Sequence, residues 1–142
     1  MTTAYTLTFV LAAASVFVYH VLQKLTPTHV NPILALALTY LIALASTLAL
    51  LPLFPYKGTL VSELRAITWH SYALGVAVLG IELGFLLAYR AGWNAGLAAL
   101  AVNAIAAIAL LGFSIVALSQ GVNAKQVMGF FVCLGGLWLI MT

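Results

Sequence analysis

Charged side chains are what this sequence lacks most. Only 5% of its 142 residues are charged, with five Lys and Arg against two Asp and Glu, whereas 65% are hydrophobic. A water-soluble domain carries about 25% charged residues, so most of this chain needs a bilayer as its solvent. The few positive charges form no basic cluster, and such a chain is too weakly charged to present a nucleic-acid-binding surface.

Cysteine and metal-binding patterns are also scarce. Cys133 is the single cysteine, so the sequence contains no disulfide framework and no cysteine-based metal site. The three histidines show no ligand spacing on one helix, and neither a Ser-His-Asp order nor a phosphate-binding loop is present. We therefore expect no enzymatic activity, no metal and no cofactor.

The N-terminal stretch MTTAYTLTFVLAAASVFVYH is apolar without resembling a cleavable signal peptide. It lacks the positively charged start and the short apolar core of such a signal. Its apolar run is about as long as one membrane crossing, so we interpret it as the first retained helix.

Five apolar segments are long enough to cross a membrane, for which a helix needs about 20 mainly apolar residues. Each is continuously apolar rather than alternating, which favours helices over a β-barrel. The sequence thus predicts an all-α membrane protein with one transmembrane domain over residues 1–142. The predicted helices span about 4–24, 32–54, 69–89, 94–118 and 124–141.

Turn residues separate these helices. Asn31 and Pro32 are typical of a helix start, with Asn as the N-cap and Pro at the first helical position. Residues 90–94 and 119–123 are predicted to form tight turns. The longer connection, 55–68, places Leu60, Val61, Leu64 and Ile67 on one helical face, which favours a short interfacial helix.

Positive charge is nearly balanced across the membrane. Five crossings place the termini on opposite sides, with three positive charges on the N-terminal side and two on the other. Since an excess of Lys and Arg marks the cytoplasmic side, a single orientation and a dual topology, in which copies insert both ways, are both open. We favour dual topology. The charges counted are Lys57, Arg65 and Lys125 against Lys24 and Arg90.

The second half carries a recognisable pattern, YRAGWNAGLAALAVNAIAAIALLGFSIVALSQGVNAKQVMGFFVCLGGLWLIM. It resembles the end of an EamA-type half in the drug/metabolite transporter superfamily. There a helix rich in small residues leads through a short turn to a last helix with two glycines, which correspond to Gly129 and Gly136. The family turn usually carries an acid and an arginine, and Ser119, Gln120 and Gly121 stand in their place here. The resemblance covers about 90–142.

This resemblance implies a transporter whose complete unit is two five-helix halves of opposite orientation. Transporters alternate access by rocking two inverted repeats around a site near the midplane. A lone half recovers that symmetry by pairing with a copy inserted the other way. The resemblance therefore implies an antiparallel homodimer in a bacterial or archaeal plasma membrane, the cell inner membrane.

Glu82 lies in the middle of LGIELGFLLAYRAG, within the third predicted helix. Counting 1.5 Å per residue places it about 12 Å from Arg90 and about 20 Å from Trp69, well inside the hydrocarbon. An ionisable residue there costs roughly 2.5–3.5 kcal/mol unless it faces a cavity or a partner. We expect a carboxyl that couples to protons or binds a cation. The alternative is a protonated Glu that joins two helices by a hydrogen bond.

The helix of Glu82 offers further candidates. Phe85, Leu86 and Tyr89 share its face, and Tyr89 could line a substrate path or belong to an interfacial belt. The same helix contains Gly80 and Gly84, a pair of small residues that lets another helix approach closely. We therefore expect a neighbouring helix to pack at this pair.

Two polar residues on other helices complete the candidate site. Asn103 is the strongly polar residue inside the fourth helix, on a face with Gly96, Ala99, Ala106 and Ala107, and would bond to another helix or contribute to the cavity. His20 could titrate near neutral pH, or simply be solvated near the interface. Tyr19 and Tyr40 could add aromatic faces for a cation.

The predicted function is a secondary active transporter, proton-coupled, for a small cationic or neutral polar metabolite or drug. It would act as an antiparallel homodimer with Glu82 at mid-membrane. The alternative is a non-transporting membrane subunit, or one half of a heterodimeric transporter.

Overall fold

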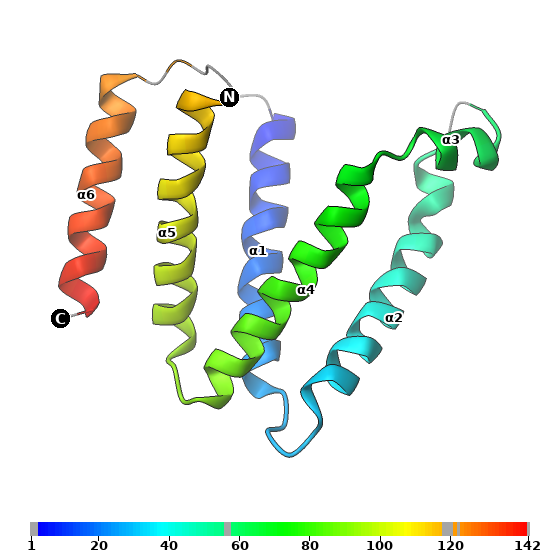
Figure 1. The fold of residues 1–142 in the computed structure, drawn as a ribbon, viewed down its shortest axis with the longest axis horizontal. Helices are drawn as coiled ribbons and strands as arrows, with labels where there is room; N and C mark the ends of the chain where they lie inside the picture. Colours follow the sequence, from blue (N-terminus) through cyan, green and yellow to red (C-terminus); the bar gives the residue numbers. More distant parts are fainter. Residues whose placement is uncertain (1–2, 56–57, 118–120, 122, 142) are drawn as a thin grey trace. The chain divides into compact units, whose positions relative to one another are not determined.

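Helices account for all the regular structure in the described residues of the computed structural model, which are 3–55, 58–117, 121 and 123–141. The prediction of an all-α chain is confirmed. Lys57, Leu118, Ser119 and Gln120, which figure in the charge count, the fourth helix and the family turn, lie outside these residues. The elements are α1 (Thr3–Leu25), α2 (Pro32–Leu50), the 3-10 helix η1 (Leu51–Leu53), α3 (Leu60–Ala66), α4 (Trp69–Arg90), α5 (Ala95–Val116) and α6 (Ala124–Met141) (Figure 1).

Asparagine side chains cap two of the long helices. The Asn31 Oδ1 atom accepts hydrogen bonds from the backbone N–H groups of Ile33, at 2.9 Å, and Leu34, at 3.3 Å. Pro32 follows at the first helical position, so the predicted start of the second helix is confirmed. Asn94 caps α5 in the same way. Asn94 is therefore the N-cap, and α5 begins at Ala95, one residue after the predicted start at 94.

The connection between α2 and α4 contains the short helix that the sequence predicted. Its start, at α3, is held by a capping box in which the Ser62 N–H donates to Thr59 Oγ1, at 3.2 Å, and the Thr59 N–H donates to Ser62 Oγ, at 3.1 Å. On the other side of the connection, α2 tightens into η1 at Pro52, because proline cannot donate the next helical hydrogen bond.

The chain divides into two compact units. The first comprises Met1–Lys24 and Ala91–Thr142, and within it α5 packs against α6. The second comprises Leu25–Arg90, and within it α2 packs against α4. Each unit thus contains two long helices that pack against each other.

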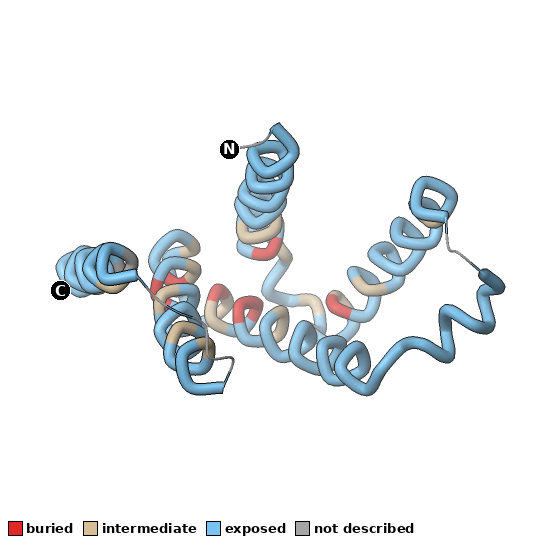
Figure 2. Tube along the Cα trace, turned by 90° about the horizontal axis from the view of Figure 1, so that it is seen from above, coloured by how far each residue is buried: buried red, intermediate tan, exposed pale blue. Residues whose placement is uncertain are grey.

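The long helices expose apolar side chains along most of their length, as Figure 2 shows by the scarcity of buried positions. Four helical stretches of the described chain are long and apolar enough to cross a membrane, at Thr3–Leu25, Pro32–Leu53, Trp69–Arg90 and Ala95–Val116. Such surfaces are stable against lipid rather than water. The apolar part of α6, Val127–Gly136, is shorter, so a fifth crossing stays a prediction.

Candidate functional site

The inward face of α4 carries Glu82. Phe85, Leu86 and Tyr89 follow it at helical spacing, and their exposed fractions are only 6%, 1% and 5%. Glu82 itself is half-buried at the edge of this face. The face that the sequence assigned to Glu82 is therefore the buried side of the helix.

Tyr89 lies inside the protein rather than in an exposed belt. Its ring packs against that of Phe85, with ring centres 5.8 Å apart. Because an interfacial tyrosine keeps its ring at the lipid headgroups, the low exposure of Tyr89 favours a packed position on the Glu82 face.

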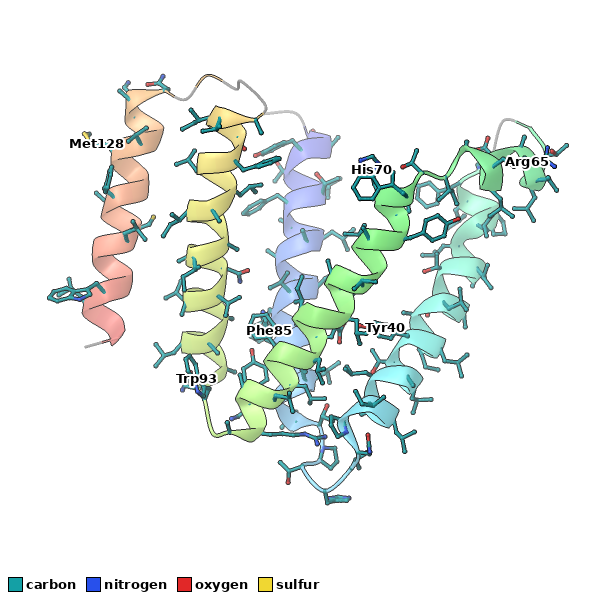
Figure 3. All side chains as sticks on the ribbon, in the orientation of Figure 1. Tyr40, Arg65, His70, Phe85, Trp93 and Met128 are labelled. Atoms are coloured by element: carbon teal, nitrogen blue, oxygen red, sulfur yellow. The ribbon has the colours of Figure 1, made fainter. Side chains whose placement is uncertain are left out.

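Tyr40 of α2 is one side chain of the second unit that interacts with Glu82. The two helices are in contact, and Tyr40 interacts electrostatically with the Glu82 carboxyl. Figure 3 shows Tyr40 extending from α2 toward α4. The tyrosine hydroxyl is buried and has no hydrogen-bond partner among the residues that the structure describes. A phenol and a carboxyl on two apolar helices thus lie within range of each other's electrostatic field.

A groove of about 420 Å³ runs beside Tyr40, between α2 and α4. Gly75 and Val78 lie seven and four residues before Glu82, so they continue its helical stripe toward the start of α4. The lining is mainly apolar, with the hydroxyls of a tyrosine and a serine as its polar groups. It consists of Tyr40, Ser71, Leu74, Gly75 and Val78.

The sequence indicated Tyr40 only as one of two possible aromatic partners, and it gave no indication of Ser71. The α4 residues of the groove could have been found from their spacing, because Val78, Gly75 and Ser71 lie four, seven and eleven residues before Glu82 and therefore share its helical face. No such signal identifies Tyr40, since it depends on how α2 and α4 are aligned.

Two predicted site residues belong to the first unit. His20 is half-buried on α1, and its ring lies edge-on to that of Tyr19, with centres 4.8 Å apart. Asn103 is exposed on α5, while the buried positions of that helix are Ala98 and Ala101. The predicted site residues are thus divided between the two units: His20 and Asn103 belong to the first, and Glu82 and Tyr89 belong to the second.

The pair Gly80 and Gly84 does not contact another helix in the described part of the chain. A Cβ atom added at either position would meet no atom within 4 Å. Both glycines lie on the side of α4 away from Glu82. The close approach expected from their spacing is therefore absent from these residues.

Two cations hold loop backbones within their own units. The Lys24 ammonium donates to the Trp93 carbonyl oxygen at 2.8 Å in the first unit. The Arg90 guanidinium donates to the Pro27 carbonyl oxygen at 3.3 Å in the second. Both are charge-assisted hydrogen bonds to backbone carbonyl groups near helix ends, so each side chain has a role in holding a loop.

No group of three or more His, Cys, Asp or Glu side chains that could hold a metal ion occurs among the described residues. The described residues of the site include the Glu82 carboxyl, the Tyr40 phenol and a mainly apolar groove that also contains the Ser71 hydroxyl.

Comparison with known proteins extends the resemblance to almost the whole chain. The sequence profile of the EamA-like transporter family matches residues 3–142, beyond the region of about 90–142 in which the pattern was visible. No curated protein and no solved structure matches the sequence significantly. Together with its membrane-length helices, the match makes this a multi-pass membrane protein of transporter type. The chain belongs to the EamA-like transporter family.

Proposed function

We propose that this chain is a proton-coupled secondary transporter of a small cationic or neutral polar solute, and that it works as an antiparallel homodimer. The plasma membrane of a bacterium or archaeon is its proposed location. The observation that carries the proposal is the half-buried Glu82 carboxyl beside Tyr40, within a chain of the EamA-like transporter family.

One carboxyl can couple two fluxes. Its negative charge inside a membrane bundle is costly, and either a bound proton or a bound cation removes that cost. Because both neutralise the same group, the binding of one favours release of the other, and this competition is reciprocal. The half-buried position of Glu82 supports such a role, since a group sealed completely within the fold could not exchange ligands.

The inverted pairing follows from the helix count. Five crossings, with α6 as the fifth, give one half, and we assign its inverted partner to a second copy of the chain. Two copies of opposite orientation would create the pseudo-two-fold arrangement on which alternating access depends. The three-to-two division of positive charges supports insertion in both directions.

Reconstituted vesicles test the coupling. A benzyltrimethylammonium gradient is a suitable probe, because this quaternary ammonium ion cannot carry a proton across the bilayer itself. We expect the wild-type protein to move protons, reported by an interior pH dye, in response to that gradient. Glu82→Gln keeps the size of the side chain but removes the titratable group, so its proton flux should fall to that of protein-free vesicles.

Glu63→Gln is the matched control, because Glu63 is the other acidic residue and lies exposed on α3. Its proton flux should equal that of the wild type. Wild-type flux in Glu82→Gln would overturn the coupling role of Glu82. A purified chain that forms no crosslinked dimer with itself would instead fit a non-transporting subunit or one half of a heterodimer.

A further inference from the structure

The connection between α2 and α4 exposes several large apolar side chains. They lie on η1, on α3 and directly beside these two helices, and the most open of them, Phe54, is 75% exposed. Large exposed apolar patches mark surfaces that contact another molecule or a membrane. We call this set the connector surface, and it consists of Leu53, Phe54, Leu60, Val61, Leu64 and Ile67.

The short helix α3 within this connection is apolar on one side and polar on the other. Its three large apolar side chains lie within about 100° of one another around the helix axis, at 3.6 residues per turn. They are Leu60, Val61 and Leu64. The remaining arc carries the polar side chains Ser62, Glu63 and Arg65. Because the acid and the cation offset each other, the polar side of α3 has no net charge.

Trp69 marks the level of the lipid headgroups at the start of α4. Its side chain is 70% exposed and stacks on the ring of His70, with centres 4.1 Å apart. The His70 Nδ1 atom is hydrogen-bonded to the Thr68 hydroxyl at 3.0 Å. A large ring beside polar groups is typical of the interfacial belt of membrane proteins, where tryptophan is enriched. The membrane boundary therefore crosses the chain where the connection meets α4.

The chain keeps α3 close to this boundary. With seven residues, α3 is about 10 Å long and too short to cross the hydrocarbon core. Only Ile67 and Thr68 separate it from α4, and this link spans at most about 11 Å even when fully extended. Figure 1 shows α3 at the end of the α2–α4 pair. The helix is thus confined to the headgroup layer and its immediate surroundings.

We propose that the connector surface is a membrane-surface anchor, and that its partner is the boundary between headgroups and acyl chains in the nearest lipid leaflet. The helix α3 lies flat in that layer, with Leu60 and Leu64 toward the acyl chains and Arg65 toward water. The anchor holds one end of the packed α2–α4 pair at a fixed depth. The inference goes beyond the proposed function, because it requires only that α2 and α4 span a membrane.

Continuity favours lipid over a second copy of the chain or a soluble partner. The exposed apolar side chains of η1 follow directly on Leu48 and Leu50, which are exposed in a membrane-length stretch. One lipid leaflet covers both regions together, whereas a partner protein would need a separate apolar surface for the connection. The offset charges of Glu63 and Arg65 also give a charged partner nothing to select.

Fluorescence quenching at single positions of the full-length protein measures the depth of α3. Cys133, the single cysteine of the chain, is first removed by Cys133→Ser, and one new cysteine at a time carries a nitrobenzoxadiazole label. Each labelled protein is reconstituted in phosphatidylcholine vesicles. Quenching by nitroxide-labelled phosphatidylcholine is then compared with quenching by iodide present on both sides of the membrane. The variants are Leu60→Cys, Leu64→Cys, Ser62→Cys, Arg65→Cys and, as an exposed reference within α4, Val76→Cys.

The two sides of α3 should respond in opposite ways. At Leu60→Cys and Leu64→Cys we expect strong quenching by the nitroxide lipid and a loss of quenching by iodide, as at Val76→Cys. At Ser62→Cys and Arg65→Cys iodide should be the stronger quencher, because these positions face water. Strong iodide quenching at all four positions of α3 would overturn the anchor. Protection of Leu60→Cys and Leu64→Cys from both quenchers would overturn lipid as the partner and show that protein covers this side.

Adding phosphatidylglycerol to the vesicles tests how the anchor binds. Because Glu63 and Arg65 offset each other, we expect the same quenching pattern with and without this anionic lipid. A pattern that depends on phosphatidylglycerol would contradict insertion through the apolar side of α3.

Discussion

At the scale of single residues, Asn103 is the side chain for which we expect a hydrogen-bond partner in a second chain. Its amide is exposed on α5, and it has no hydrogen bond within the described part of the chain. An unsatisfied amide facing hydrocarbon is unfavourable. In the proposed homodimer, Asn103 would bond to the second copy. We expect Asn103→Leu to weaken self-association by about 0.6–1.7 kcal/mol, or roughly threefold to twentyfold in the dimer dissociation constant.

Energy transfer between labelled chains, diluted in lipid vesicles, measures that constant. Thr47→Val is the control, because Thr47 is also exposed but its hydroxyl donates to Ala43 of its own helix at 2.8 Å. Its dimer dissociation constant should equal that of the wild type. An Asn103→Leu variant that associates as tightly as the wild type would contradict a role for this amide between chains.

The sequence identified Glu82 but not its neighbour. A lone acid in an apolar run is visible without any structure, since the energetic cost of its position marks it. The proximity of Tyr40 is different in kind. It depends on the alignment of α2 against α4, and both helices have too few polar residues for their sequences to favour one register.

At the scale of elements, the turn between α4 and α5 depends on Gly92. Its φ angle of 97° lies in a region that side chains with a Cβ atom rarely adopt, while an added Cβ would meet no atom within 4 Å. The cost of Gly92→Ala is therefore a backbone cost, about 1–2 kcal/mol. We expect a lower unfolding midpoint for the purified protein titrated with sodium dodecyl sulfate.

Gly112→Ala provides the comparison. Gly112 lies within α5, and a Cβ atom there also meets open space. Because alanine is favoured over glycine inside a helix, this variant should be more stable by up to about 1 kcal/mol. Equal shifts in the two variants would show that position-independent effects of the methyl group, rather than the backbone at Gly92, determine stability.

Helix starts were more predictable than helix faces. The Asn31-Pro32 start and the short α3 helix could be predicted because a cap or an amphipathic pattern acts within a few residues. The side of α5 that is buried could not. Ala98 and Ala101 are buried while Asn103 is exposed, and a helix made almost wholly of small and apolar residues carries little signal for which side faces the protein.

At the scale of the whole molecule, the proposed transporter is complete only as an inverted pair. The family match covers residues 3–142, which we assign to one such half. An odd number of crossings and a nearly even division of positive charge would allow copies to insert both ways. The pair would then place two copies of Glu82 about one central axis, as alternating access by inverted repeats requires.

The location of both termini in living cells tests this central claim most directly. Reporters that are active on only one side of the membrane would be fused to the N-terminus in one set of chains and to the C-terminus in another. We predict that each terminus is found on both sides in comparable amounts. A single fixed side for each terminus would contradict the inverted homodimer.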